Sequence, residues 1–183
     1  MKYISMFLYL FFLLQDFSFA TNNLKHNNHT NKHSHDEKNM PGLKGINTTE
    51  KEENDLKTIF RTHKEINREV IKLENGIKTI TESNNSRLRS AIIDHVSMMV
   101  TRLEEGKNPK VFIQTPILDR LFEFYDVINT ELEVTEKGII VIQTSNNEKV
   151  VKLLQIHADE VSDMSKRGMI AVHQRMMKKY NKH

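Results

Sequence analysis

An internal duplication is the feature of this sequence that most constrains the fold. Residues 56–106 (the first repeat) align with residues 118–168 (the second repeat) at an offset of 62 positions and without a gap. The repeats are identical at 14 of the 51 aligned positions, where chance gives about three. Because a solenoid needs three or more copies, two copies predict a single domain made of two similar halves.

Both repeats predict the same order of elements. Apolar residues at helical spacing indicate a first helix over Leu56–Arg68 and over Leu118–Thr130. Two short extended stretches follow in each repeat, and the turn between them leads into a glycine, which is typical of a hairpin. These stretches are Val70–Leu73 and Gly76–Thr81 in the first repeat, and Leu132–Val134 and Gly138–Thr144 in the second.

A longer helix completes each repeat. Ser83 and Ser145 are its predicted N-caps, because a serine hydroxyl accepts hydrogen bonds from the first free backbone N–H groups of a helix. Ser145 and Glu148 also have the spacing of a capping box. Gly106 and Gly168 suit the C-terminal ends of the two long helices.

These elements predict an α+β fold. The two helix–hairpin–helix units are expected to form one four-stranded antiparallel sheet that packs against the paired long helices. Residues 110–117 link the units, and residues 169–179 are expected to continue as a helix. The duplicated domain is predicted to span residues 55–180.

The first twenty residues predict an export signal. Lys2 precedes an apolar run over Ile4–Leu14, and Ser18 and Ala20 place small residues where a signal peptidase requires them. A membrane span needs roughly 20 apolar residues, so this run is too short for one. We therefore expect cleavage after Ala20, a periplasmic or secreted protein, and no stable membrane span in the mature chain.

Residues 21–54 predict a disordered linker, because they contain too few apolar residues to offset the entropy of ordering. The linker carries a tract of four histidines beside two acidic residues, and such a tract binds divalent metal ions weakly. Its histidines are His26, His29, His33 and His35. The alternative interpretation is a solvated, Asn-rich spacer.

The composition excludes several kinds of site. The chain has no cysteine, which excludes disulfides, thiolate metal sites and cysteine nucleophiles. Its net charge of +3 is too small to indicate a nucleic-acid partner. Nine histidines and nine methionines remain as soft ligands for transition metals.

Each of the two repeats contains short motifs that carry a family resemblance. They are TESNN, DHV and RLEEG in the first, and EKGIIVIQTSNNEKVVKLLQIHADEV in the second. They resemble a family of small exported bacterial proteins, itself uncharacterised, whose members have TESDDP or TSDDP before the long helices. The resemblance covers about residues 57–173 and implies a bacterial envelope location without an established activity. The chain departs from the family at Asn84-Asn85 and Asn146-Asn147, where members have acids, and at Tyr125, where members often have His.

His95 and His157 are the strongest candidate ligands. They occupy equivalent positions in the two repeats, and each falls on the apolar stripe of its long helix. If the two helices pack side by side, the imidazoles meet near the pseudo-twofold axis, as a Cu or Zn ion or bis-histidine haem b requires. The alternative is that each is a core histidine with a backbone or carboxylate hydrogen-bond partner.

The C-terminal segment adds secondary candidates. Met164, Met169 and His173 offer thioether and imidazole groups, and the spacing of Met169 and His173 puts them on one side of a helix. Methionine as adaptable core filler is the alternative. His63, at the position of Tyr125, is a further candidate ligand or catalytic base.

The sequence thus indicates an exported protein that binds a transition metal or haem through His95 and His157, rather than an enzyme. No G-x-S-x-G, H-E-x-x-H, Gly-rich phosphate loop or EF-hand loop is present. The alternative function is a non-catalytic envelope interaction module. Its helical faces bind a partner protein or a second copy, and its histidines are structural.

Overall fold

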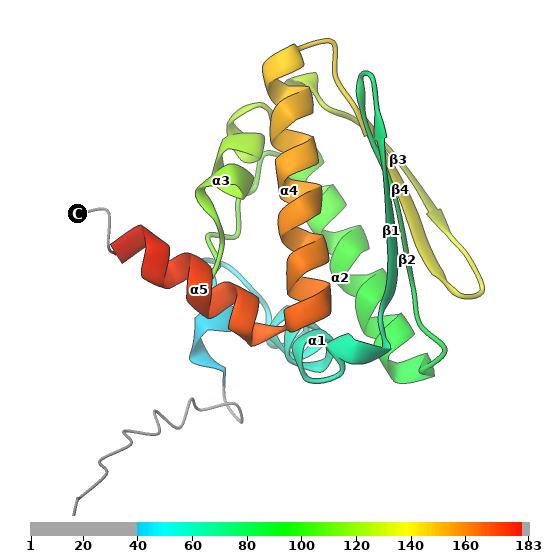
Figure 1. Cartoon of the computed structure of the whole chain (residues 1–183), viewed down its shortest axis with the longest axis vertical. Helices are drawn as coiled ribbons and strands as arrows, with labels where there is room; N and C mark the ends of the chain where they lie inside the picture. The colour runs from blue at the N-terminus through cyan, green and yellow to red at the C-terminus, as the bar shows by residue number, and fades with distance from the viewer. Residues whose placement is uncertain (1–39, 181–183) are drawn as a thin grey trace, which may run out of the picture. The chain divides into compact units, whose positions relative to one another are not determined.

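The computed structural model describes residues 40–180 and confirms the α+β fold. Five α-helices accompany four strands in this part of the chain (Figure 1). The first half contains α1 (Glu50–Arg61), β1 (Asn67–Leu73), β2 (Gly76–Glu82) and α2 (Ser86–Glu104). The second contains α3 (Pro116–Glu123), β3 (Asn129–Val134), β4 (Gly138–Thr144) and α4 (Glu148–Arg167), followed by α5 (Met169–Tyr180). The short 3₁₀ helices are η1 (Pro41–Leu43), η2 (His63–Glu65) and η3 (Tyr125–Val127).

The sheet has the order β1-β2-β4-β3, with antiparallel neighbours throughout. The second strands of the two hairpins, β2 and β4, pair at its centre, where Thr79 lies opposite Val141. These two residues are equivalent in the duplication, so the pseudo-twofold axis passes between them. Exchanging the repeats leaves the β2–β4 register unchanged.

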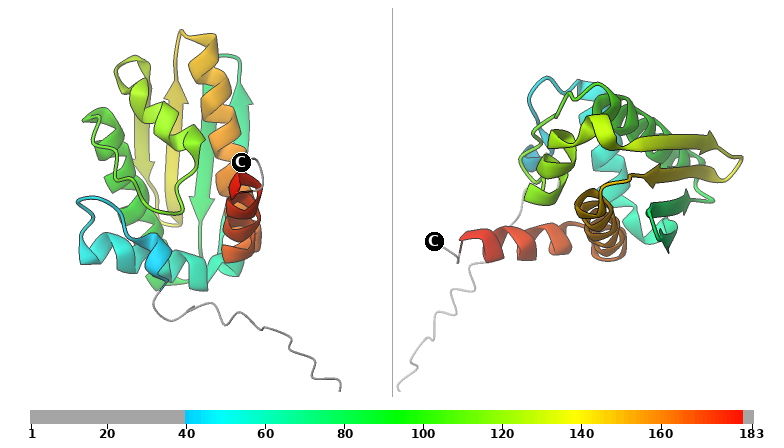
Figure 2. Two further views of the ribbon diagram at one scale, coloured as in Figure 1. Left: turned by 90° about the vertical axis from the view of Figure 1, so that its left-hand side faces the viewer. Right: turned by 90° about the horizontal axis from the view of Figure 1, so that it is seen from above.

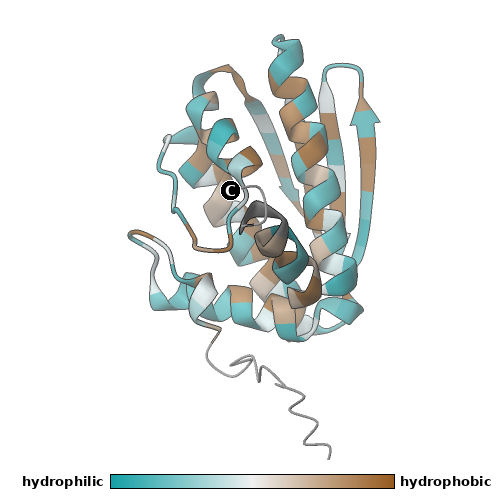
Figure 3. Ribbon diagram, turned by 60° about the vertical axis from the view of Figure 1, so that its left-hand side comes forward, coloured by the Kyte–Doolittle hydropathy of each residue, from teal (hydrophilic) through white to brown (hydrophobic). Residues whose placement is uncertain are grey.

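The helices lie on one face of the sheet (Figures 1 and 2). Each long helix packs mainly on the strands of the other repeat: α4 contacts β1 and β2, whereas α2 contacts β4 most closely and also touches β3 and β2. The shorter helices follow the same symmetry, since α1 packs on α2 and α3 packs on α4. Apolar and hydrophilic positions alternate along the ribbons, as expected for elements with one buried face (Figure 3).

The predicted serine N-caps are wrong by two residues. Asn85 and Asn147 cap the long helices, and each side-chain carbonyl oxygen accepts a hydrogen bond from a first-turn backbone N–H group. The serine hydroxyls instead donate to backbone carbonyls: Ser83 to Glu65 and Ser145 to Val127. They therefore tie each long helix to the 3₁₀ turn that precedes its hairpin.

The predicted first helices extend too far, because a 3₁₀ turn and the start of a strand continue their apolar spacing. The helix α1 also begins earlier than predicted, at Glu50, inside the expected linker. Thr49 and Glu52 form a capping box there, and Arg102 Nε donates to the Glu52 carboxylate at 2.7 Å. Although burial raises the pKa of Glu52, the hydrogen bonds from Arg102 and Thr49 lower it to about 2.

The ordered domain also begins before residue 55. Met40 and Leu43 are buried against Phe60 and Val172. Backbone hydrogen bonds join this segment to the link between the repeats, for example from Ile46 N to the carbonyl oxygen of Pro109 at 2.6 Å. Residues 40–54 thus belong to the packed domain, whereas the rest of the predicted linker and the predicted export signal lie outside the described residues. No helix within residues 40–180 is long and apolar enough to cross a membrane.

Candidate functional site

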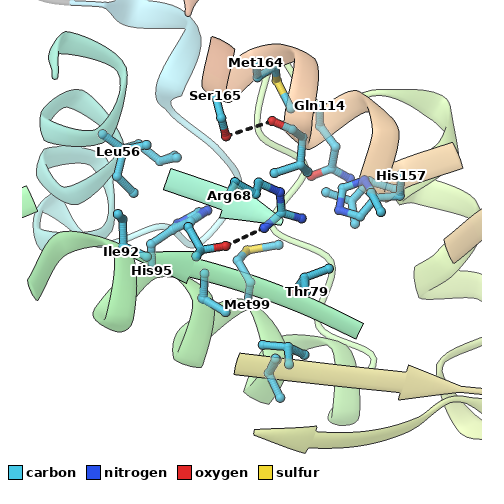
Figure 4. A pocket seen from close by; sticks show the side chains of 18 of the residues that line it. Leu56, Arg68, Thr79, Ile92, His95, Met99, Gln114, His157, Met164 and Ser165 are labelled. Carbon is cyan, nitrogen blue, oxygen red and sulfur yellow. Dashed lines mark hydrogen bonds between the residues drawn. The ribbon is translucent and has the colours of Figure 1, made fainter. Parts of the chain in front are cut away.

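A pocket of about 270 Å³ lies between the helical face of the sheet and the two long helices. The helices α1 and α3 and residues 111–115 of the link complete its wall. Most lining side chains are aliphatic, aromatic or methionine. Figure 4 shows a smaller set of polar side chains that enter this pocket from the strands, the link and the long helices.

The pocket lies on the pseudo-twofold axis. Thr79 and Val141, the axial pair of the sheet, both line it. Equivalent residues of the two repeats line it on opposite sides, and these include His95 with His157, Met99 with Val161, and Thr81 with Gln143. The pocket therefore lies where the two similar halves of the domain face each other.

His95 on α2 and His157 on α4 both line this pocket. Both imidazoles line the pocket without direct packing of the two long helices, because both face the space between these helices. Neither ring has a hydrogen bond to another described residue, and His157 Nδ1 is buried without a partner. The nearest carboxylate, that of Glu160, is 4.0 Å from His157 Nδ1.

Both imidazoles are neutral at pH 7. Burial lowers the pKa of His95 to about 4, against the opposing effect of the nearby carboxylates of Asp55 and Glu52. Burial, together with the positive charges of Arg68 and Arg175, lowers the pKa of His157 to about 4. About 23% of the His157 side-chain surface is accessible, and we attribute this exposure to the pocket that it lines, not to the outer surface.

Arg68 on β1 is a lining residue that the sequence did not single out. Its Nη1 donates to Thr81 Oγ1 at 2.5 Å, whereas its Nε is buried without a partner. No carboxylate of the described residues forms an ion pair with Arg68. Burial lowers its pKa to about 10, so the side chain is still a cation at pH 7.

Gln114 in the link between the repeats is a second polar residue that the sequence analysis missed. Its Nε2 donates to Asn108 Oδ1 at 2.8 Å and to Asp119 Oδ1 at 2.9 Å. Its Oε1 points the other way and is buried without a donor. Buried polar atoms are nearly always hydrogen-bonded, so unpartnered atoms on Arg68, Gln114 and His157 mark this pocket as a place for a polar ligand group or water.

The remaining predicted ligands are not gathered together. Met164 lines the pocket, but it also packs with Met169 against the cluster around Val172, which is the role of core filler. His173 on α5 is not among the lining residues. His63 does line the pocket, and its Nδ1 lies 3.0 Å from the carbonyl oxygen of Ser165.

The histidine tract, comprising His26, His29, His33 and His35, lies outside the described residues. Within residues 40–180, no group of three or more His, Asp or Glu side chains is placed to hold a metal ion. Comparisons of the chain with protein-family models, with curated proteins and with solved structures found no match. The resemblance to exported bacterial proteins stays a prediction from the motifs.

Proposed function

We propose that this protein is a non-catalytic binding protein for a small, largely apolar molecule. The observation that carries the proposal is the pocket on the pseudo-twofold axis, whose wall is mostly apolar and includes a few convergent polar groups. This combination is typical of small-molecule sites. Export to the periplasm or the exterior, predicted from residues 1–20, is part of the proposal and makes the ligand an extracytoplasmic one.

A neutral fluorescent probe tests this proposal. N-phenyl-1-naphthylamine is expected to bind the purified domain saturably, with one site per chain and increased emission. The substitution Val161→Phe fills part of the pocket from α4 and is expected to weaken binding at least tenfold, since the added ring occupies the space that the probe needs.

The matched control is Ile156→Phe, because Ile156 is on the same helix and is exposed. This variant is expected to bind the probe like the unmodified protein. Absence of saturable binding, or equal affinity in Val161→Phe and Ile156→Phe, contradicts the proposed function.

A transition metal or haem b is the second candidate ligand. It is favoured by the neutral imidazoles of His95 and His157, which line one pocket together with the Met164 thioether. The charge of Arg68 in the same pocket opposes a bare Cu or Zn ion, which places this candidate second. Titration with Cu(II) and with haem, measured by absorption spectroscopy, is expected to show stoichiometric binding. The double variant His95→Ala, His157→Ala is expected to abolish it. Binding that survives both substitutions refutes this candidate.

The interaction module remains a further hypothesis. It predicts a protein partner or a homodimer and requires neither histidine to touch a ligand. This hypothesis would be favoured by a concentration-dependent dimer in solution, together with probe binding that is the same in Val161→Phe and in the double histidine variant as in the unmodified protein.

A further inference from the structure

We propose that the ligand of this pocket carries a carboxylate head and that Arg68 is its anchor. This inference rests on the proposed function and adds the chemical class of the ligand, a monocarboxylate with an apolar body. Three features of the structure support it: the charge balance of the pocket, the unpartnered N–H group of Arg68, and the predominance of apolar side chains in the rest of the lining.

The charge balance favours an anion. Arg68 is the single Arg, Lys, Asp or Glu side chain among the described residues that line the pocket, and His95 and His157 are neutral at pH 7. A buried charge is costly unless it is paired and hydrogen-bonded. No described residue supplies the negative partner, so a bound anion is the group that neutralises Arg68.

The guanidinium is held in place for such a partner. Its Nη1 donates to Thr81 on the neighbouring strand, which restrains the group, and its Nε has an N–H without a partner. Figure 4 shows Arg68, His95 and His157 directed into the same cavity from β1, α2 and α4. Each neutral imidazole has one N–H to donate, so a carboxylate beside Nε of Arg68 has further donors within the same pocket.

The rest of the lining suits an apolar body and excludes a large polar one. Around the arginine the wall is built from side chains such as Ile92, Val96, Met99 and Val161. A pocket of about 270 Å³ is near the lower end of the range for small-molecule sites, which is about 300 to 1,000 Å³. This size indicates a medium-length alkyl chain, for which decanoate is a suitable probe.

A series of head groups on one chain length tests the inference in the unmodified protein. Decanoate, 1-decanol and decyltrimethylammonium compete with bound N-phenyl-1-naphthylamine at pH 7.5, where the carboxylate is ionised. Decanoate is expected to displace the probe at a concentration about 10 to 100 times lower than 1-decanol, because hydrogen bonds to a charged group are strong. Decyltrimethylammonium is expected to be the weakest competitor.

Variants of Arg68 in the same competition assay are the second test. Arg68→Met is expected to abolish the preference for decanoate over 1-decanol. Arg68→Lys retains the charge and is expected to retain part of the preference. The control Arg87→Met, at an exposed position on α2, is expected to leave the preference unchanged.

The outcomes separate the two proposals. Equal competition by decanoate and 1-decanol in the unmodified protein, or a preference that survives in Arg68→Met, refutes the carboxylate anchor and leaves the proposed function standing. Absence of probe binding in the unmodified protein refutes both. If Arg68→Met does not fold, the head-group series and the Arg68→Lys variant decide the question.

Discussion

Lowering the pH from 7 to 4.5 is expected to destabilise the folded protein by about 2 to 3 kcal/mol for each of His95 and His157. Both side chains have a folded-state pKa near 4, below the value of 6.5 for an unperturbed histidine. The unfolded chain therefore binds more protons than the folded chain between these two values. The contribution of these two histidines to the free energy of unfolding is fully present above pH 6.5 and is lost as the pH falls toward 4.

Urea unfolding at a series of pH values measures this effect. The control is the double variant His95→Gln, His157→Gln, which lacks both titrating rings and is expected to show a flatter dependence between pH 6.5 and 4.5. The comparison separates the histidines from the acidic groups, including Glu52, whose stabilising ionisation is lost only below its ordinary pKa of 4.5. Equal slopes for the two proteins above pH 4.5 would show that the imidazoles are not buried in the neutral form.

A bound ligand changes this dependence in a way that connects it to the proposed site. An anion next to the imidazoles favours their protonated forms. Between pH 6.5 and about 5.5, where the carboxylate stays ionised, saturating decanoate is therefore expected to reduce the loss of stability. The imidazoles that make the folded protein acid-sensitive are also donors available to a carboxylate.

The fold was predictable because local signals and the duplication agree. The strand Gly138–Thr144 has the bounds predicted from its sequence, and Gly106 and Gly168 both adopt positive φ at the ends of the long helices, as a glycine in that place allows. The N-caps were misplaced because Ser83 and Asn85 are both good capping residues two positions apart. Only the tertiary partner, the carbonyl oxygen of Glu65, decides which of them caps the helix.

The site was predictable only in part. The helical spacing placed His95 and His157 on the inner faces, and both line the pocket. Arg68 was missed because its sequence neighbourhood predicts the end of a helix, whereas Arg68 lies on β1, where it pairs with the buried Thr81 and points inward. The pairing of β1 with β2 puts Arg68 and Val70 on the inner face, and the adjacent apolar residues Val70 and Ile71 do not by themselves indicate that face.

Gly76→Ala and Gly138→Ala are expected to destabilise the protein by about 3 kcal/mol or more each, or to prevent folding. These glycines begin β2 and β4 at equivalent positions of the two repeats. A methyl group on Gly76 would overlap the backbone carbonyl oxygen of Gln143, and one on Gly138 would overlap that of Thr81. Because backbone atoms cannot rotate away, the central strands would have to separate, and the pocket floor lies on these strands.

The equivalence of the two glycines makes the test quantitative. Gln143 and Thr81 are themselves equivalent residues, so the same close approach occurs twice, and the two costs are expected to agree within about 1 kcal/mol in urea unfolding. Lys137→Ala, one residue before Gly138 in an exposed turn, is the control and is expected to change stability by less than about 0.5 kcal/mol. A small cost for either glycine would show that the β2–β4 pairing is not as close as described. A large cost for one alone would show that the two halves do not share the pseudo-twofold axis on which the pocket is built.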